Sequence, residues 1–447
     1  MEMQRKWEEL SPEEKSEQWF TSWLSPKGVK FVSPEAEKAY KERITRLKDA
    51  IQLKKTPDRV PIFPIISFFP AFYAGMTPEE AMYDYDKTAV AWRQYTLAFA
   101  PDLHFGAFQV CPGRVFDILD YKLYGWPGHG VSPRYTYQCI EGEYMKEDEY
   151  DALIQDPSDF WLRLYIPRIF GALEPLKKLA PFTDMLEMPL VGGTLAPYGL
   201  PEVQTALESI LKAGKEARRW EQFVASFDKE MTERGFPNGA GGMTKAPFDA
   251  ISDTLRGTHG IICDMYRQPD KLLKAMEKLV PLMVKMGISS CRASGIPIVF
   301  MPLHKGADGF MSDEQYRTFY WPTFQKVMLG LINEGLVPMV FAEGAYNSRL
   351  EVIAELPRGK TMWFFDQTNM DRAKEIIGDT ICIAGNVPSA LLQTGTSQQI
   401  KDYCKRLIDV VGKDGGFIMS NGAVIDEAKP ENVRAMIDFT KEYGIYS

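Results

Sequence analysis

One histidine and two acidic residues in the second half of the chain each follow a short apolar run. His304 comes after Met301-Pro302-Leu303, Glu343 after five apolar residues, and Asp366 after Trp363-Phe364-Phe365. A carboxylate in such a weakly hydrated setting must be paired, protonated or bound to a metal. One imidazole with two carboxylates is a plausible ligand set for Zn²⁺ in an open catalytic site. The same three side chains without a metal would serve as general acid and base, and the sequence leaves both interpretations open.

Further polar and aromatic residues near such runs are candidates for holding a substrate. Asn386 and Asn421 end two later runs, and an aromatic segment follows the first predicted strand. Asparagine beside glycine also tolerates a left-handed backbone, so a purely conformational role for the two asparagines stays open. The predicted substrate-binding residues are Phe68, Phe69, Tyr73, Tyr346, Asn386 and Asn421.

The elements that must position these residues are apolar, β-prone runs separated by helix-like segments. Runs that are apolar on both faces indicate buried parallel strands. The predicted strands cover residues 60–67, 103–108, 184–191, 296–303, 337–344, 361–367, 381–386 and 416–421. Eight strands alternating with helices predict an α/β fold of the (β/α)8 TIM barrel type, whose sites lie at the carboxyl ends of the strands. His304, Glu343, Asp366, Asn386 and Asn421 are therefore expected to meet in space.

The remaining segments predict how the barrel is extended. Residues 1–57 predict an N-terminal helical extension, in which Ser11-Pro12 and Ser33-Pro34 have the pattern of helix starts, and residues 58–447 predict the barrel domain. Residues 121–144 predict a β-excursion that either lines a pocket mouth or covers a barrel end. The glycine cluster at 235–242 lacks the Walker lysine and serine, so we predict a flexible loop between helices.

The composition of the chain limits which functions are plausible. The chain has 447 residues, of which 45% are hydrophobic, and a net charge of −8 without a basic block, which argues against nucleic-acid binding. Its apolar runs fall short of a membrane span and its start lacks a signal-peptide core, so a cytoplasmic location is expected. The six cysteines are scattered, which favours reduced thiols.

The end of the chain resembles the uroporphyrinogen decarboxylase superfamily, and more closely its anaerobic, corrinoid-dependent methyltransferase branch than the decarboxylases. Two segments carry the resemblance: Ala384-Gly385-Asn386-Val387 before Gly395-Thr396, and Gly416-Phe417-Ile418-Met419-Ser420 before Lys429-Pro430-Glu431-Asn432-Val433. The family fold is a (β/α)8 barrel, in agreement with the strand count. The resemblance implies methyl transfer, with zinc as cofactor and a corrinoid carried by a partner protein.

Two departures from the family shape the expected activity. Decarboxylases carry an arginine motif after the first strand for a substrate with eight carboxylates, whereas Ser67–Tyr73 contains no cation. The methyltransferases hold zinc through a His-x-Cys pair and a later cysteine, which align here with Phe341-Ala342-Glu343 and with the Gly422-Ala423 position. A carboxylate in place of a thiolate suits an oxygen-containing substrate.

The leading hypothesis is therefore a methyltransferase of the O-demethylase type, which moves a methyl group from a small O-methylated, possibly methoxyaromatic, molecule to the cobalt of a corrinoid protein. Its predicted catalytic residues are Glu343, Asp366 and His304, which are also the predicted metal ligands. The alternatives are a decarboxylase or lyase using carboxylate and histidine proton transfer, and a non-catalytic tetrapyrrole-binding barrel. The sequence also allows a homodimer.

Overall fold

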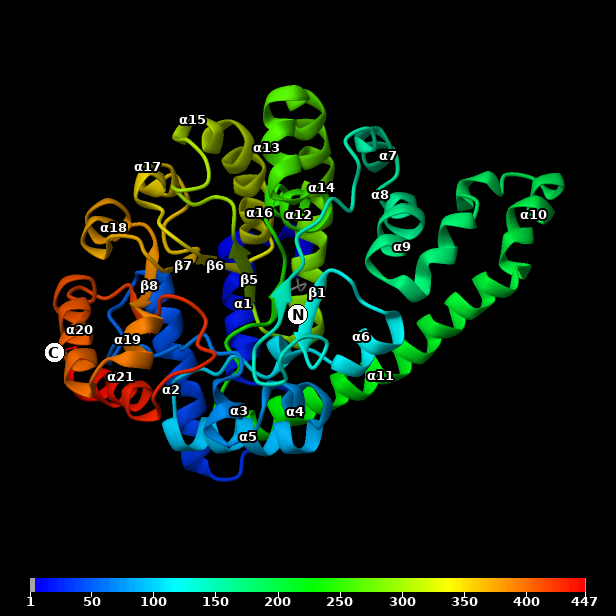
Figure 1. Cartoon of the computed structure of the whole chain (residues 1–447). Coiled ribbons are helices and arrows are strands. Elements are labelled where there is room, and N and C mark those ends of the chain that lie inside the picture. The colour runs from blue at the N-terminus through cyan, green and yellow to red at the C-terminus, as the bar shows by residue number, and fades with distance from the viewer. Residues whose placement is uncertain (1–4, 447) are drawn as a thin grey trace.

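The computed structural model describes residues 5–446 and contains a parallel barrel (Figure 1). Residues 1–4 of the predicted extension and Ser447 lie outside the described residues. Six strands form a continuous parallel sheet in the order of their numbering. They are β4 (Gly242–Met243), β5 (Ile298–Leu303), β6 (Val337–Ala342), β7 (Met362–Phe365), β8 (Cys382–Val387) and β9 (Phe417–Asn421). Of the last five, β5, β6, β7 and β9 lie within the runs that the sequence predicted as strands, and β8 ends one residue beyond its predicted run.

Two extended segments close this sheet into the eight-stranded barrel. In the first, Ile62 pairs in parallel with Met419 of β9, and Phe63 donates its N–H to the Met419 carbonyl at 3.0 Å. The second segment joins the first through the N–H of Leu103 on the Ile62 carbonyl at 3.4 Å, and pairs onward through His104 and Asn238. The predicted strands at 60–67 and 103–108 therefore complete the (β/α)8 barrel.

The third strand was predicted at the wrong place in the sequence. Residues 184–191 contain the end of a 3-10 turn, Phe182–Asp184, and the start of helix α10 (Met188–Leu195). The true third strand runs through the glycine cluster, where Gly241 donates its N–H to the Ile298 carbonyl at 2.9 Å. A built Cβ on Gly241 would lie 2.2 Å from the Ile296 carbonyl oxygen, so glycine is required by this close approach. The apolar pattern was missing from the real strand for that reason.

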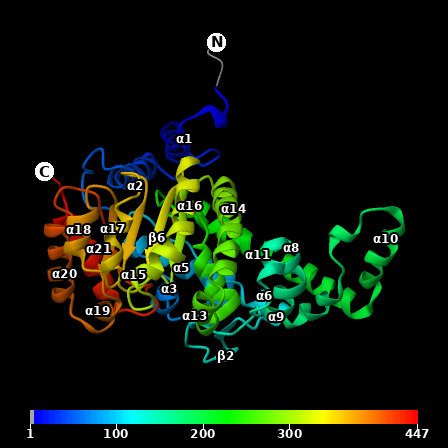
Figure 2. The same ribbon diagram turned by 90° about the horizontal axis from the view of Figure 1, so that it is seen from above.

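Helices cover the outside of the barrel and its amino-terminal end. The helices that follow the later strands are α14 (Pro269–Ser294), α16 (Trp321–Asn333), α18 (Met370–Ile377), α20 (Ser397–Val410) and α21 (Pro430–Tyr443). The predicted extension forms α1 (Pro12–Leu24) and α2 (Pro34–Gln52), with Ser11 and Ser33 as their caps. Figure 2 shows α1 and α2 on the side opposite α15 (Asp313–Gln315) and α19 (Ser389–Thr394), which follow strands. The carboxyl ends of the strands therefore face the viewer in Figure 1.

Aromatic side chains fill the inside of the barrel. Phe63 packs edge-on against Phe364 with ring centroids 5.7 Å apart, and Phe105 packs against Phe300 at 5.0 Å. Phe341 joins the same buried cluster. Because large rings from several strands occupy the centre, the barrel is a packed core and a site can form only above it, at the strand ends.

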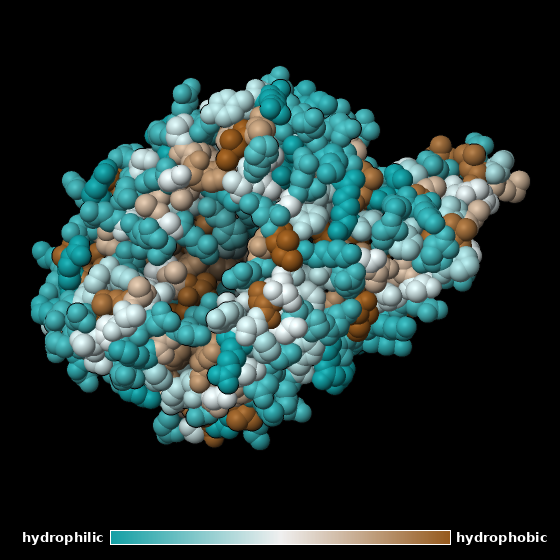
Figure 3. Space-filling view, viewed as in Figure 1, coloured by the Kyte–Doolittle hydropathy of each residue, from teal (hydrophilic) through white to brown (hydrophobic). Residues whose placement is uncertain are grey.

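The connection between the second and third strands is long and leaves the barrel. It contains the predicted β-excursion, with β1 (Tyr124–Pro127), β2 (Gly130–Val131) and β3 (Gln138–Cys139), and then an arm formed by α10 and the long helix α11 (Pro201–Glu233). The arm projects away from the barrel, and hydrophobic residues gather at its tip (Figures 1 and 3). Leu186 and Met188 are 79% and 88% exposed there. Within residues 5–446, every helix is too short or too polar to traverse a lipid bilayer.

Candidate functional site

The centre of the site is His304, which β5 delivers to the carboxyl end of the barrel. Its Nδ1 donates to the Asp253 carboxylate at 2.6 Å, and Lys245 Nζ lies 2.7 Å from the same Asp253 oxygen. Although burial opposes it, the bond from His304 and the charge of Lys245 lower the pKa of Asp253 to about 2. Burial disfavours the His304 cation, but Asp253 outweighs that effect and raises the pKa of His304. Asp253 therefore fixes both the tautomer and the charge of the imidazole.

The other ring nitrogen of His304 faces Glu343, at the end of β6. Nε2 of His304 lies 4.0 Å from a carboxylate oxygen of Glu343. Burial raises the pKa of Glu343; the His304 cation opposes this, and the charge of Asp366 adds to it. Glu343 is thus an acid that holds its proton above the ordinary range, beside an imidazolium, at a face that is hollowed near its centre (Figure 3). The prediction that His304 and Glu343 meet is confirmed by this distance.

A fully buried carboxylate supports the histidine from below. Asp249 accepts hydrogen bonds from the backbone N–H of His304 at 3.2 Å, from that of Lys305 at 3.1 Å and from the Tyr320 hydroxyl at 2.6 Å. Burial, with the charge of Asp253, raises the pKa of Asp249. These three bonds fix the backbone on which the imidazole stands.

Lys245, Asp249 and Asp253 were not predicted from the sequence. They lie at intervals of four residues just after β4: Lys245 in the loop before α12 (Pro247–Ile251), Asp249 on α12 and Asp253 on the helical turn that follows it. That spacing places Asp249 and Asp253 on one helix face, which was the available signal. This signal was missed because the third strand was assigned to residues 184–191. The helix after β4 was therefore not expected to follow a strand of the barrel.

The three predicted metal ligands do not form a metal site. Asp366 Oδ2 accepts the N–H of Gly344 at 3.1 Å, and Nδ1 of His304 is engaged by Asp253. Among the described residues, no group of three or more His, Cys, Asp or Glu side chains could hold a metal ion. An open catalytic zinc site uses three protein ligands, and only His304 and Glu343 face each other here. The residues present therefore do not fit the zinc expected from the sequence.

The two predicted asparagines are occupied by hydrogen bonds to protein groups. The Asn421 amide donates to the carbonyls of Ile65 and Ala423 at 2.8 and 2.7 Å, and its oxygen accepts the Ile65 N–H at 2.9 Å. Asn386 donates to the Asp366 carbonyl at 2.9 Å and accepts from the Tyr403 hydroxyl at 3.0 Å. Asn421 therefore closes the barrel and Asn386 braces the loop after β7, which corrects the predicted substrate contacts.

The predicted aromatic residues also pack into the protein. Phe68 and Phe69 are 0% and 1% exposed, and residues 69–73 form helix α3 (Phe69–Tyr73) instead of an open loop. Tyr73 packs on Phe99 with centroids 5.1 Å apart, and Tyr346 is fully buried beside the site. Phe68, Phe69 and Tyr346 are therefore enclosed by protein, where the sequence predicted direct contact with a substrate, and Tyr73 is half-buried.

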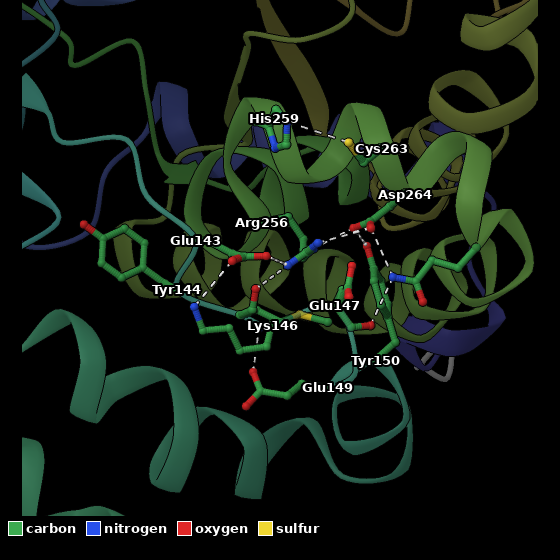
Figure 4. A network of polar contacts seen from close by, with 12 residues as sticks. Glu143, Tyr144, Lys146, Glu147, Glu149, Tyr150, Arg256, His259, Cys263 and Asp264 are labelled. Atoms are coloured by element: carbon green, nitrogen blue, oxygen red, sulfur yellow. Dashed lines mark hydrogen bonds and ion pairs between the residues drawn. The ribbon is translucent and has the colours of Figure 1, made fainter.

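The β-excursion crosses the rim of the site and is pinned there by a buried arginine. Arg256 pairs with Asp264 of α13 (Gly257–Arg267) at 2.6 Å and also with Glu143 of the excursion (Figure 4). This anchor places Glu141 3.9 Å from Lys305. The sequence left two roles open for the excursion, lining a pocket mouth or covering a barrel end. This geometry favours the first.

Three comparisons place the chain among known proteins. Residues 237–443 match the family model "Uroporphyrinogen decarboxylase (URO-D)". The uroporphyrinogen decarboxylase of Syntrophotalea carbinolica is 23% identical over 176 residues, 39% of this chain and 49% of that protein. That of Aromatoleum aromaticum is 29% identical over 142 residues, 30% of this chain and 39% of that protein. The chain thus spans about half the length of the curated relatives it matches.

A solved structure is similar over nearly the whole chain. The methyltransferase from Methanosarcina mazei has a TM-score of 0.58 and 15% identity, covering 89% of this chain and 98% of that one. This likeness shows the barrel fold. The matched family region begins at Pro237, at the third strand, and includes His304, Glu343 and their acidic supports. Residues 237–443 of this chain are therefore similar to the uroporphyrinogen decarboxylase family.

Proposed function

We propose that this chain transfers a methyl group from the oxygen of a small, neutral, O-methylated molecule, for example a methoxyarene, to the cobalt of a corrinoid that a separate protein carries. The observation that carries the proposal is the pairing of Glu343 with His304 across 4.0 Å at the strand ends. A carboxyl group with a raised pKa, beside a cationic imidazole, is a proton donor poised for a leaving oxygen.

The charge of the site supports a neutral substrate. Four acidic side chains lie at the site: Asp249, Asp253, Glu343 and Asp366. Lys245 is paired with Asp253 at 2.7 Å. Lys305 donates to the Thr258 hydroxyl at 2.6 Å and lies near Glu141. With its lysines engaged and its acids in excess, this site would repel the polycarboxylate substrate of a true uroporphyrinogen decarboxylase.

The proposed reaction needs one proton from the protein. The reduced corrinoid, as methyl acceptor, supplies the electron pair that forms the new bond to the methyl carbon. The carbon–oxygen bond breaks with its electron pair on oxygen, and Glu343 delivers the proton that completes the alcohol or phenol. The positive charge of His304 limits how far the pKa of Glu343 rises, and Asp253 keeps the imidazole in position. Protonation of the leaving oxygen is general acid catalysis, so no metal step is invoked.

A second candidate is a decarboxylase or lyase. It is favoured by the names of the curated relatives and by the Lys245, Asp253 and His304 relay, which suits proton transfer to a carbanion. The third, a tetrapyrrole-binding barrel without turnover, is supported by the loss of the methyltransferase zinc ligands at Glu343 and Gly422.

The deciding experiment incubates the protein with chemically reduced cobalamin, or a reduced corrinoid protein, and a panel of methoxyarenes. We expect loss of the Co(I) absorbance together with one phenol released per methyl group transferred. Glu343→Gln should abolish both signals, and the exposed Glu355→Gln should not. Absence of cobalt methylation across the panel would reject the proposal, and carbon dioxide release from carboxylated analogues would support the second candidate. A bound tetrapyrrole spectrum without any turnover would support the third.

A further inference from the structure

The arm formed by α10 and α11 ends in a helix that the rest of the chain leaves uncovered. Every residue of α10 except Thr194 is exposed, although the helix carries no charged side chain. Figures 1 and 3 show α10 at the far end of the arm, with hydrophobic side chains gathered there. A helix that is apolar on all sides is normally buried, so α10 needs a cover that residues 5–446 do not supply.

The arm has a small hydrophobic core of its own. Leu173, Leu176 and Val203 are buried together at the base of the arm. Nearer the tip, the ring of Phe182 packs on that of Tyr198 with centroids 6.1 Å apart. The exposure of α10 is therefore a property of a folded arm.

Six apolar side chains make up the exposed surface of the tip, which we call the tip patch: Phe182, Leu186, Met188, Leu190, Val191 and Leu195. The charged residues beside it are Asp184 and Glu187, and the chain has no basic residue from Leu179 to Leu211. An acidic tip argues against adsorption to an anionic membrane, which attracts helices rich in lysine and arginine.

A second apolar surface lies on α11, further from the tip. Ile210 and Leu211 lie four and three residues before Gly214, so the three share one face of the helix. Leu211 is 67% exposed, and a Cβ built on Gly214 would meet no atom of another element within 4 Å. This face, which we call the stripe, is therefore open to another chain.

The stripe has the opposite charge to the tip patch. Lys212, Lys215 and Arg218 are exposed in this part of α11, with Glu208 as the one exposed acid among residues 207–218. Among the described residues, none of these four side chains forms an ion pair, and neither do the two acids of the tip patch. Because the acidic tip and the basic stripe lie on the same folded arm, they can meet each other only between two copies of the chain.

We propose that two copies of this chain pair through their arms about a two-fold axis, with α10 of each copy packed on the stripe of the other. The pairing is self-complementary, as a two-fold interface requires. The tip patch with Ile210 and Leu211 exposes roughly 800 Å² in all, and each partner of a standard-size stable interface buries about 800 Å². The inference goes beyond the proposed methyl transfer and does not depend on it.

Analytical ultracentrifugation of the full chain over a range of concentrations measures the pairing. We expect a dimer that dissociates on dilution. Met188→Asp should raise the dissociation constant at least about a hundredfold, because a two-fold interface loses the buried contact twice. Val90→Asp, at an exposed aliphatic residue of α5 (Tyr85–Phe99), should leave the constant unchanged, and circular dichroism shows whether both variants are folded.

Charge reversal tests which two surfaces meet. Reversing the tip acids, Asp184→Lys with Glu187→Lys, should weaken the dimer about tenfold, because like charges then face each other. Reversing the bases of the stripe, Lys215→Glu with Arg218→Glu, should have the same effect. All four substitutions in one chain should restore the wild-type dissociation constant, since the facing charges are again opposite.

The inference is overturned by a chain that stays monomeric at every concentration, by a Met188→Asp dimer as tight as the wild type, or by a fourfold variant that pairs no more tightly than either charge-reversed variant alone. Binding of a monomeric chain to a corrinoid protein or to phosphatidylcholine vesicles, lost in Met188→Asp, would also overturn it and would assign the tip patch to that partner.

Discussion

Nδ1 of His304 donates to Asp253 at 2.6 Å. His304 follows strand β5, and Asp253 lies 51 positions earlier in the sequence, on the helical turn after α12. The opposite nitrogen of the same ring faces Glu343. One imidazole thus connects a carboxylate whose pKa is lowered to about 2 with a carboxyl whose pKa is raised. Two acids with pKa values pushed apart by their surroundings are the arrangement in which one keeps a charge and the other keeps a proton.

Asp253→Asn should lower the pKa of His304, because the neutral amide still accepts the Nδ1 hydrogen but no longer stabilises the cation. The readout is a histidine-ring NMR titration, which is practical with four histidines in the chain. Asp151→Asn, which removes an exposed partner of Lys271, is the matched control. An unchanged His304 titration in Asp253→Asn would contradict the assigned role.

The same pair makes stability depend on pH in a defined direction. Since the pKa of His304 is raised on folding, the pair stabilises the protein below the ordinary histidine pKa, and this stability is lost as pH rises through the raised value. Asp253→Asn should therefore cost more unfolding free energy at about pH 5 than at about pH 9. Urea unfolding at the two pH values measures the difference, and an equal cost at both would argue against a charged pair.

Glu343→Gln should lower turnover by about 10² to 10⁴, the range expected for loss of a general acid, with little change in substrate affinity. Because the protonated form is the active one, wild-type turnover should fall as pH rises through the raised pKa of Glu343. Initial rates across pH test both statements. A variant with normal turnover, or a wild-type rate that climbs through this pH range, would remove Glu343 from the mechanism.

The sequence predicted the barrel and the meeting of His304 with Glu343 for a physical reason. Buried parallel strands such as β6 and β7 are continuous apolar runs, and Glu343 stands out directly after one of them. The third strand could not be found in the same way, because close approach to Ile296 requires Gly241 and leaves no apolar signal. That single error hid Asp249 and Asp253.

The structure buries Asn421 and Phe69, which were predicted to contact a substrate, for a different reason. Pattern shows where a side chain lies along a strand, but it does not show which backbone groups already occupy it. Asn421 ends β9 as expected, yet its amide is used by Ile65 and Ala423. Phe69 follows the first strand as expected, yet Tyr95 and Phe99 enclose its ring.

Asn421→Ala should destabilise the barrel where it closes. The amide makes two bonds to Ile65 and one to Ala423, so its loss leaves buried backbone groups unsatisfied at a cost of about 2 kcal/mol or more. Thermal unfolding measures the loss, with the exposed Asn333→Ala as control. A melting temperature equal to that of the control would show that the closure is held by other contacts.

Asp249→Ala should reduce both stability and turnover. Two backbone N–H groups and the Tyr320 hydroxyl would lose their buried acceptor, which predicts a cost of about 3 kcal/mol or more. Tyr320→Phe removes only one of these bonds and should cost about 1 kcal/mol. Chemical unfolding of both variants gives the comparison. Equal costs would mean that the two backbone bonds contribute nothing.

Chelation should leave the activity intact. Open catalytic zinc sites use three protein ligands, and here Asp366 accepts the N–H of Gly344 while only His304 and Glu343 face each other. We therefore expect purified protein to carry far less than one zinc per chain by elemental analysis, and dialysis against EDTA to leave methyl transfer unchanged. The corrinoid acceptor is added after dialysis, so its cobalt does not enter the measurement. Stoichiometric zinc that is lost in Glu343→Gln, together with activity restored only by added zinc, would show that these side chains rearrange to bind a metal and that Glu343 acts as its ligand instead of as the acid.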